Sequence, residues 1–198
     1  MPELSFQQLL IRALAALIVS LVHGLSVVLL SRAAGDRGPE YDGRLTANPF
    51  AHLDLIGGLA LVLFACGWAR PSNVDGGLSG ARRAAIVAGS LLVSLAFAFL
   101  LYRVVTAIPA TALPGTATAT VRVLGRYVAA ATAGLVILNV IPIWPLTGSH
   151  LVPGPRDSWQ EGRRAWLSLA LFAAVALSAV AGILGPATAR LTGVLIGS

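Results

Sequence analysis

The stretch that decides the fold is LLIRALAALIVSLVHGLSVVLL, residues 9–30. It is apolar except for Arg12, His23 and a few small residues. A stretch of this length crosses the hydrocarbon core of a bilayer as a helix, in which every backbone group is hydrogen-bonded. A secretory signal would have a shorter apolar region and a small-residue cleavage site, whereas this stretch runs into Ser31 and Arg32. We therefore expect a transmembrane helix that is not cleaved off.

Four further apolar stretches follow this helix. They cover residues 53–69, 84–107, 126–143 and 166–184. The stretch 53–69 is at the lower length limit for a span, so it either crosses the bilayer or re-enters. The tail, residues 185–198, is apolar but broken, and we expect it at the interface. The prediction is an all-α polytopic membrane protein with four to five transmembrane helices and a single membrane domain over residues 1–198.

The composition excludes a soluble globular protein. Of the 198 residues, 57% are hydrophobic and 11% are charged, against about 45–50% and about 25% in soluble domains. The formal net charge is +6, all 14 basic residues are Arg, and no basic run exceeds two residues. The chain therefore has no basic stripe for nucleic acid, and membrane lipids are its expected surroundings. The single cysteine, Cys66, excludes an internal disulfide and a cysteine-clustered metal site.

The loops carry little information on orientation. They are short, rich in Gly and Pro, and cover residues 31–52, 70–83, 108–125 and 144–164. If every stretch crosses, arginines are divided almost evenly between the two sides, and a single re-entrant segment would reverse the small bias. The sequence leaves the orientation open.

Three polar clusters interrupt or follow the apolar stretches. They are VHGLSV at 22–27, GRLTANPFAHLD at 43–54, and NVIPIWPLTGS at 139–149. A polar group inside a span costs a few kcal/mol unless it has a partner, so each one is a functional candidate. His23, near the middle of the first stretch, is the clearest.

Taken in this order, the clusters resemble the short bacterial form of the site-2 protease family of intramembrane zinc metalloproteases. The resemblance runs over about residues 14–151, and the corresponding core covers about 9–151, followed by a helix at about 165–185. It implies a bacterial cytoplasmic membrane protein. In the family, zinc is held by two His of an H-E-x-x-H helix and an Asp of a later L-D-G motif, and the Glu is the base for the zinc-bound water.

The sequence departs from the family at the catalytic positions. His23 matches the first ligand, but Gly24 stands at the position of the base and Val27 at that of the second His ligand. The position of the Asp ligand is Thr147, a neutral hydroxyl. What remains is the scaffold of Gly, Pro and Trp positions. We therefore expect a pseudoprotease with no catalytic residue and no bound zinc.

The three histidines also have simpler, non-catalytic interpretations. We expect His23 to be a neutral imidazole that shares a hydrogen bond with a neighbouring helix. His52 follows Asn48-Pro49, an N-cap and first-turn pair, and we expect it to be solvated at headgroup depth, with Asp54 favouring a helix N-terminus. A three-His zinc site built from His23, His52 and His150 stays open as an alternative, and with it an active metalloprotease with non-standard ligands.

A partner is expected where helical hydrogen bonding is interrupted. Pro142 and Pro145 keep the proline frame of the third motif although its ligand has become Thr147. Prolines free backbone groups that need other partners. The resemblance implies that a helix approaches this segment, so we expect Pro142, Ile143, Pro145 and Leu146 to contact a transmembrane segment of a partner complex. The chain would then be a scaffold or accessory subunit.

Overall fold

The structure is a computed structural model that describes the chain except for residues 1–4, 75–76, 110, 113, 153–160 and 198. The described residues form helices and loops, with no strand. The long helices are α1 (Phe6–Ala33), α3 (Gly80–Ala107) and α4 (Gly115–Asn139). The shorter ones are α2 (Leu55–Phe64), α5 (Glu161–Val180) and α6 (Gly185–Ile196), with single turns η1 (Glu40–Arg44), η2 (Pro49–Ala51) and η3 (Thr147–Leu151).

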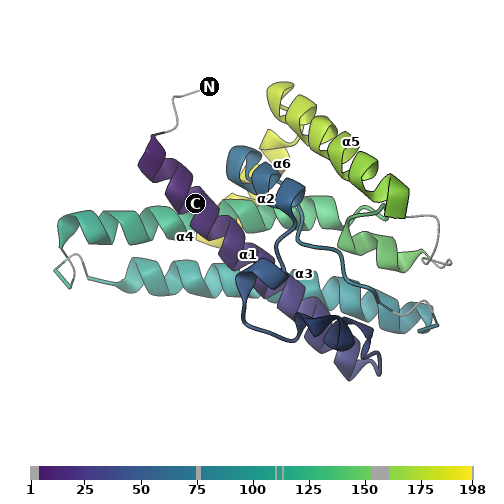
Figure 1. The fold of residues 1–198 in the computed structure, drawn as a ribbon. Helices are drawn as coiled ribbons and strands as arrows, with labels where there is room; N and C mark the ends of the chain where they lie inside the picture. Colours follow the sequence, from purple (N-terminus) through teal and green to yellow (C-terminus); the bar gives the residue numbers. More distant parts are fainter. Residues whose placement is uncertain (1–4, 75–76, 110, 113, 153–160, 198) are drawn as a thin grey trace.

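The three long helices build the frame of the molecule. Helices α3 and α4 form an antiparallel hairpin, and α1 crosses in front of both (Figure 1). Their shared core consists largely of small and branched side chains, among them Ala16, Val19, Ala129 and Leu135. By length and composition α1, α3 and α4 can each cross a membrane. The chain is therefore a membrane protein, and the spans expected at 9–30 and 84–107 are confirmed as helices.

The bounds of α4 differ from those expected. The helix begins at Gly115, so the expected loop at 108–125 is wrong. Here the Thr120 hydroxyl donates to the carbonyl of Thr116, and a backbone in an apolar solvent gains from every helical bond it can close. The helix ends at Asn139 and not at residue 143, because Pro142 has no N–H to donate and disfavours a helical residue before it.

The segment 53–69 turns back and does not cross. Helix α2 has 10 residues and is about 15 Å long, half of the hydrocarbon core of about 30 Å. After it the chain is non-helical and returns beside the helix, where the Arg70 N–H donates to the His52 carbonyl over 2.8 Å. Trp68 packs so close to Gly57 that a Cβ there would meet its carbonyl oxygen. Irregular backbone is tolerated here because it is buried in protein, as Cys66 and Trp68 are.

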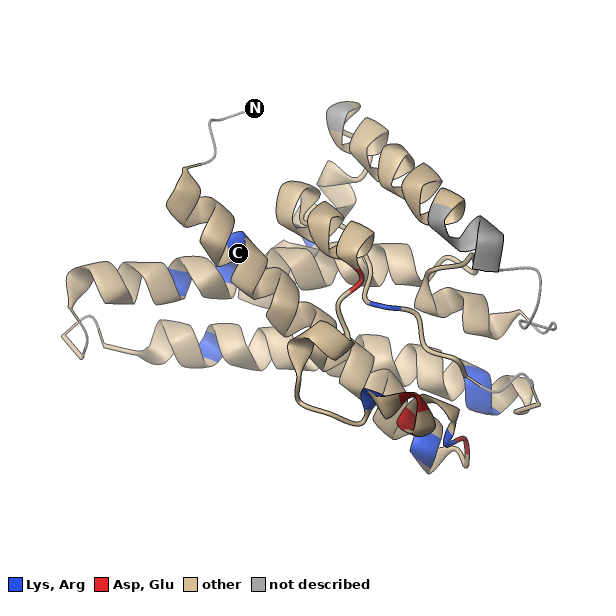
Figure 2. Cartoon of the chain, viewed as in Figure 1, with Lys and Arg blue, Asp and Glu red and all other residues tan. Residues whose placement is uncertain are grey.

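A buried arginine, Arg44, binds the chain where this re-entrant segment ends. The Arg44 guanidinium donates to the carbonyls of Arg70 and Pro71 over 2.8 and 2.6 Å, and to the Ser72 hydroxyl over 2.7 Å. Burial, reinforced by the charge of Arg70, lowers the pKa of Arg44 to about 10. These bonds place the loops before α2 and before α3 at the same end of the molecule, where most of the described acidic side chains also lie (Figure 2).

The last two helices pack on different parts of the bundle. Helix α5 packs on α2, and α6 packs on α4 and α3 (Figure 1). The expected span at 166–184 corresponds to α5, whose apolar part, Trp166–Ala179, is shorter than the three long helices. The tail expected to be broken is a helix with Pro186 in its first turn, a position where proline costs no hydrogen bond. Three of the expected four to five spans are thus long enough to cross.

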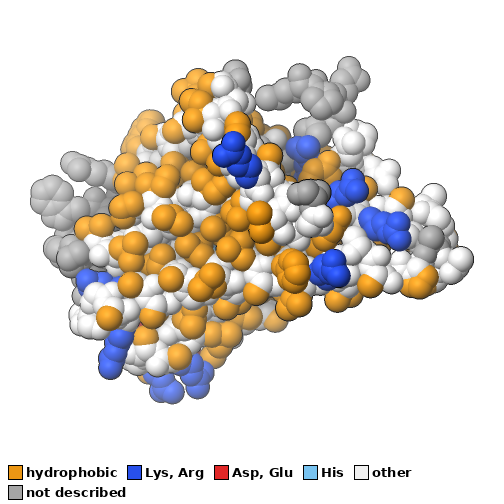
Figure 3. All heavy atoms as spheres, turned by 180° about the vertical axis from the view of Figure 1, so that it is seen from behind, with side chains coloured by type: hydrophobic (Ala, Val, Ile, Leu, Met, Phe, Trp, Pro, Cys, Tyr) orange, Lys and Arg blue, Asp and Glu red, His pale blue; other side chains and the backbone are white. Residues whose placement is uncertain are grey.

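The surface suits a bilayer. Large apolar side chains such as Leu92, Leu100 and Val104 are exposed on α3. Seen from behind, hydrophobic side chains cover much of the face, and most of the arginines stand towards its lower left and its right (Figure 3). An apolar band between charged ends matches the hydrocarbon core and the headgroup layers.

Candidate functional site

His23 is the centre of the polar network inside the helix frame. It is buried in α1 and contacts two hydroxyls, Ser94 Oγ on α3 at 3.2 Å from Nδ1 and Thr147 Oγ1 in η3 at 2.8 Å from Nε2. The sequence predicts a hydrogen bond from His23 to a neighbouring helix, and the Ser94 contact confirms it.

The network assigns the tautomer of a neutral His23. The Ser94 hydroxyl donates to the carbonyl of Ser90 over 2.8 Å, so its oxygen accepts from His23 and Nδ1 carries the proton. Nε2 then holds the lone pair and accepts from the Thr147 hydroxyl. Both ring nitrogens of His23 are therefore satisfied by neutral hydroxyls.

Asn139 positions Thr147 for this contact. Its Oδ1 accepts the Thr147 N–H over 2.9 Å, while its Nδ2 donates to the carbonyls of Leu135 and Gly67 over 2.8 and 3.4 Å. The buried amide thus joins the end of α4, η3 and the return segment after α2. Asn139 opens the polar cluster at 139–149, and the sequence alone assigned it no role. A polar residue in the last turn of an apolar helix is the feature that indicates such a role.

The space beside Gly24 is filled by the side chain of a second histidine. The ring of His52 packs against Gly24, where a Cβ would be 2.5 Å from His52 Nδ1. His52 is fully buried and its Nε2 donates to the Thr46 carbonyl over 2.9 Å, which leaves Nδ1 as a buried acceptor without a partner. Burial is the main cause that lowers the pKa of His52. The expectation of a solvated His52 is wrong, because η2 folds inward onto α1.

The capping residues around His52 are as expected. Asn48 Oδ1 accepts the N–H of Phe50 at the start of η2, and Asp54 Oδ1 accepts the N–H of Gly57 at the start of α2. These caps turn the chain into the re-entrant helix. They also hold His52, between them, against α1.

The described side chains do not fit a zinc site of the resembled kind. Val27 lies in an apolar cluster with Val74 and Ile86, and the hydroxyl of Thr147 is a poor substitute for a carboxylate ligand. Among the described residues no group of three or more His, Cys, Asp and Glu side chains is placed to hold a metal ion. His23, His52 and the buried His150 accordingly do not form one.

The four expected partner-binding residues fall into two pairs. Pro142 and Ile143 are exposed, whereas Pro145 and Leu146 are buried. The amides of Ile143 and Leu146 donate to the carbonyls of Ile141 and Ile143 in local turns. Local turns therefore satisfy these two amides without a bound chain, and the exposed pair stays open to a partner.

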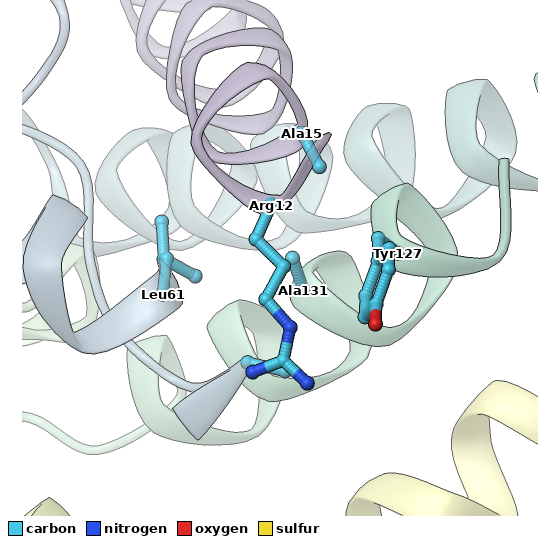
Figure 4. Close-up of a pocket in the computed structure, with 6 residues that line it drawn as sticks. Arg12, Ala15, Leu61, Tyr127 and Ala131 are labelled. Carbon is cyan, nitrogen blue, oxygen red and sulfur yellow. The ribbon is translucent and has the colours of Figure 1, made fainter. Parts of the chain in front are cut away.

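In the sequence Arg12 is only a charged residue within the first apolar stretch, whereas the structure gives its side chain specific partners. Its guanidinium donates to the carbonyls of Val62 and Leu63 over 3.3 and 3.4 Å and lies 4.9 Å from the centre of the Tyr127 ring. It thus neutralises the carboxyl end of α2 inside the membrane protein. The cavity beside it, about 10 Å³, has room for a single water (Figure 4).

Comparison with known proteins finds no family model, no curated protein and no solved structure that matches the chain.

Proposed function

We propose that the chain is a catalytically inactive membrane protein of site-2-protease-like architecture, in a bacterial cytoplasmic membrane, that serves as a scaffold or accessory subunit. It would bind transmembrane segments of a partner complex. The observation that carries the proposal is the contact of 2.8 Å between His23 Nε2 and Thr147 Oγ1. Two positions that hold zinc in the resembled enzymes face each other here as a neutral hydrogen-bonded pair.

The chemistry of the site supports the absence of proteolysis. Hydrolysis of a peptide needs a proton acceptor for the attacking water, and losing a general base costs about 10²–10⁴ in rate. Gly24 supplies no acceptor, and the neighbouring His52 ring fills the space that a longer side chain would need. Without a three-ligand site the water also lacks the activation that zinc provides.

The retained backbone supports a binding role. The segment after α4 leaves the helix at Asn139 and presents Pro142 and Ile143 on the surface beside the His23 site. A helix interruption that no longer positions a catalytic ligand is most simply explained by packing or binding. Because Ile143 is exposed and apolar at the end of a membrane helix, it suits the side of a partner helix better than water.

Two measurements test the proposal. Metal analysis of the purified protein is expected to find no stoichiometric zinc, and one zinc per chain that is lost in His23→Ala would overturn it. The Gly24→Glu variant is expected to cleave no membrane-helix substrate, because the site has no metal and His52 occupies the space of the new side chain; cleavage by this variant would overturn the proposal.

A photo-crosslinker at Ile143 tests the binding role. It is expected to capture a defined subunit that also co-purifies in mild detergent, while one at Leu92, exposed on α3, captures lipid. Equal protein labelling at both positions would show that the segment after α4 is not a binding site.

A further inference from the structure

An apolar groove opens on the surface between helices α1 and α2. Its volume is about 310 Å³, and the residues that line it include Ala13 and Leu17 of α1, Phe50 and Leu53 of the chain before α2, and Leu59 and Val62 of α2. Every lining residue is apolar or glycine. An apolar cavity of about 150 Å³ already stays free of water and takes up benzene. The groove therefore suits a hydrocarbon better than water.

The groove faces the apolar part of a bilayer. Its α1 wall belongs to a helix that can cross a membrane, and Leu55 and Leu59 on its α2 wall are exposed by 83 and 49%. From Leu55 to Val62 the groove follows α2 for about 10 Å, a third of the hydrocarbon core of about 30 Å. The molecules that surround such a surface are lipids, whose acyl chains are as apolar as leucine. An acyl chain thus matches the groove in chemistry and in depth.

A cation stands at one end of this groove. Arg12 directly precedes Ala13, and its guanidinium donates over 3.3 Å to the carbonyl of Val62; both of these neighbours line the groove. The described partners of Arg12 are neutral, namely two carbonyls and the ring of Tyr127 beside it (Figure 4). The ion pairs between described residues do not include it. In the part of the chain that the structure describes, this positive charge therefore has no anion.

Arg12 also lies near the depth of lipid phosphates. Helix α1 has 28 residues and is about 42 Å long, about 12 Å more than the hydrocarbon core. Arg12 stands about 9 Å from the start of the helix, close to the boundary between hydrocarbon and headgroups. Both of its carbonyl bonds start from Nη1, so Nη2 is left for a phosphate oxygen, the anion that a guanidinium binds with strong charge-assisted hydrogen bonds.

We propose that the groove between α1 and α2 is a binding site for one phospholipid. An acyl chain lies along Ala13, Leu17 and Leu59, and the phosphate of the same lipid accepts hydrogen bonds from Arg12 at the end of the groove. The lipid belongs to the leaflet at the end of the bundle where α1 begins. It fills the space beside the short helix α2 and supplies the anion for the cation that caps this helix. The site does not depend on the proposed scaffold function.

The test uses a phosphatidylcholine with a photo-activatable diazirine on one acyl chain. The full chain is reconstituted in phosphatidylcholine vesicles that contain a small fraction of this probe, and labelled peptides are identified by mass spectrometry. Labelling is expected to be stronger on residues 50–62 than around Leu92, which is exposed on α3 outside the groove. In Ala13→Phe the new ring fills the groove, and labelling of residues 50–62 should fall to the level around Leu92.

The matched control places the same ring outside the groove. Ala96→Phe, at an exposed alanine on α3, should leave the labelling of residues 50–62 unchanged. Ala13→Leu is a smaller filling variant in case Ala13→Phe does not fold. Equal labelling of the groove and of α3 in the wild type, or undiminished labelling of residues 50–62 in a folded filling variant, would overturn the site.

A second probe tests the phosphate contact. A diacylglycerol with the same diazirine chain lacks the phosphate, and the wild type is expected to favour the phospholipid over it about tenfold, the effect of one hydrogen bond to a charged group. Arg12→Met should lose this preference, whereas Arg126→Met, at an exposed arginine on α4, should keep it. Equal labelling by the two probes in the wild type, or a preference that survives in Arg12→Met, would overturn the phosphate contact. None of these readouts depends on zinc or on a partner subunit.

Discussion

The ring of His52 lies directly against Gly24, so that a Cβ atom on Gly24 would be 2.5 Å from His52 Nδ1 and 2.8 Å from His52 Cβ. The near atoms include the base of the side chain, so a small rotation of the ring cannot relieve the overlap. The glycine thus leaves the space that lets η2 and His52 pack inward onto α1.

Replacing this glycine is expected to destabilise the protein. Gly24→Ala gains about 1 kcal/mol in helix propensity, but overpacking costs about 1–3 kcal/mol, so the thermal unfolding temperature in detergent should fall. Adding Gly24→Ala to His52→Ala should instead raise the temperature relative to His52→Ala alone, because the methyl group fills the vacated space. A higher temperature for the single variant than for the wild type would mean that only the gain in helix propensity counts and that η2 does not pack on α1.

The pair of His23 and Thr147 predicts a separate stability effect. Thr147→Val keeps the shape but leaves Nε2 of the buried His23 without a donor, which costs about 1–3 kcal/mol. Thr147→Ser keeps the hydroxyl and should remain closer to the wild type. Chemical or thermal unfolding of both variants measures the difference, and equal stability of the two would show that the hydroxyl does not serve His23.

Arg12 is expected to stabilise the free end of the re-entrant helix. Arg12→Met keeps the apolar stem but removes the donors to the carbonyls of Val62 and Leu63 and the cation over Tyr127. We expect a loss of about 1–2 kcal/mol, as for other charges at helix ends in partly buried sites. Arg126→Met, at an exposed arginine on α4, is the control for a general loss of charge, and a similar effect in both variants would contradict the capping role.

If residues 53–69 re-enter, the chain before and after them lies on the same side of the membrane, and cysteine labelling tests this topology. In a Cys66→Ala background, Tyr41→Cys and Gly80→Cys should react with an impermeant maleimide from the same side, and Gly115→Cys from the other. All three positions are exposed. Labelling of positions 41 and 80 from opposite sides would show that residues 53–69 cross.

The same topology gives an expectation for orientation. With residues 53–69 re-entrant, the end of the frame with Tyr41 holds Arg32, Arg37, Arg44, Arg70, Arg82 and Arg83. Towards the other end, where α1 begins and α3 turns into α4, lie Arg12, Arg103, Arg122 and Arg126. By the positive-inside rule the end with Tyr41 should face the cytoplasm. The labelling experiment reads this directly.

Much of the fold follows from local properties of the chain. The long apolar runs around His23 and Ser94 determine membrane helices, because a backbone in lipid has no alternative to helical bonding. The caps at Asn48 and Asp54 follow from residues close in sequence. The end of α4 at Asn139 differs from the expected end at residue 143, although Pro142 is the local cause of this end. The beginning of α4 was missed because Thr and Ala residues favour a loop only weakly, and the apolar solvent outweighs that preference.

The site depended on contacts between residues far apart in the chain. His23, Ser94 and Thr147 meet because α1, α3 and η3 cross at one point, and no spacing along the sequence encodes that meeting. The burial of His52 and the placement of α5 over Leu146 are likewise results of packing. By itself the sequence determined that the chain enters a membrane and which segments form its long apolar helices, because these are properties of a segment and its solvent. Only the tertiary structure decided which polar groups become partners and which surface is covered, because these depend on how the helices fit against one another.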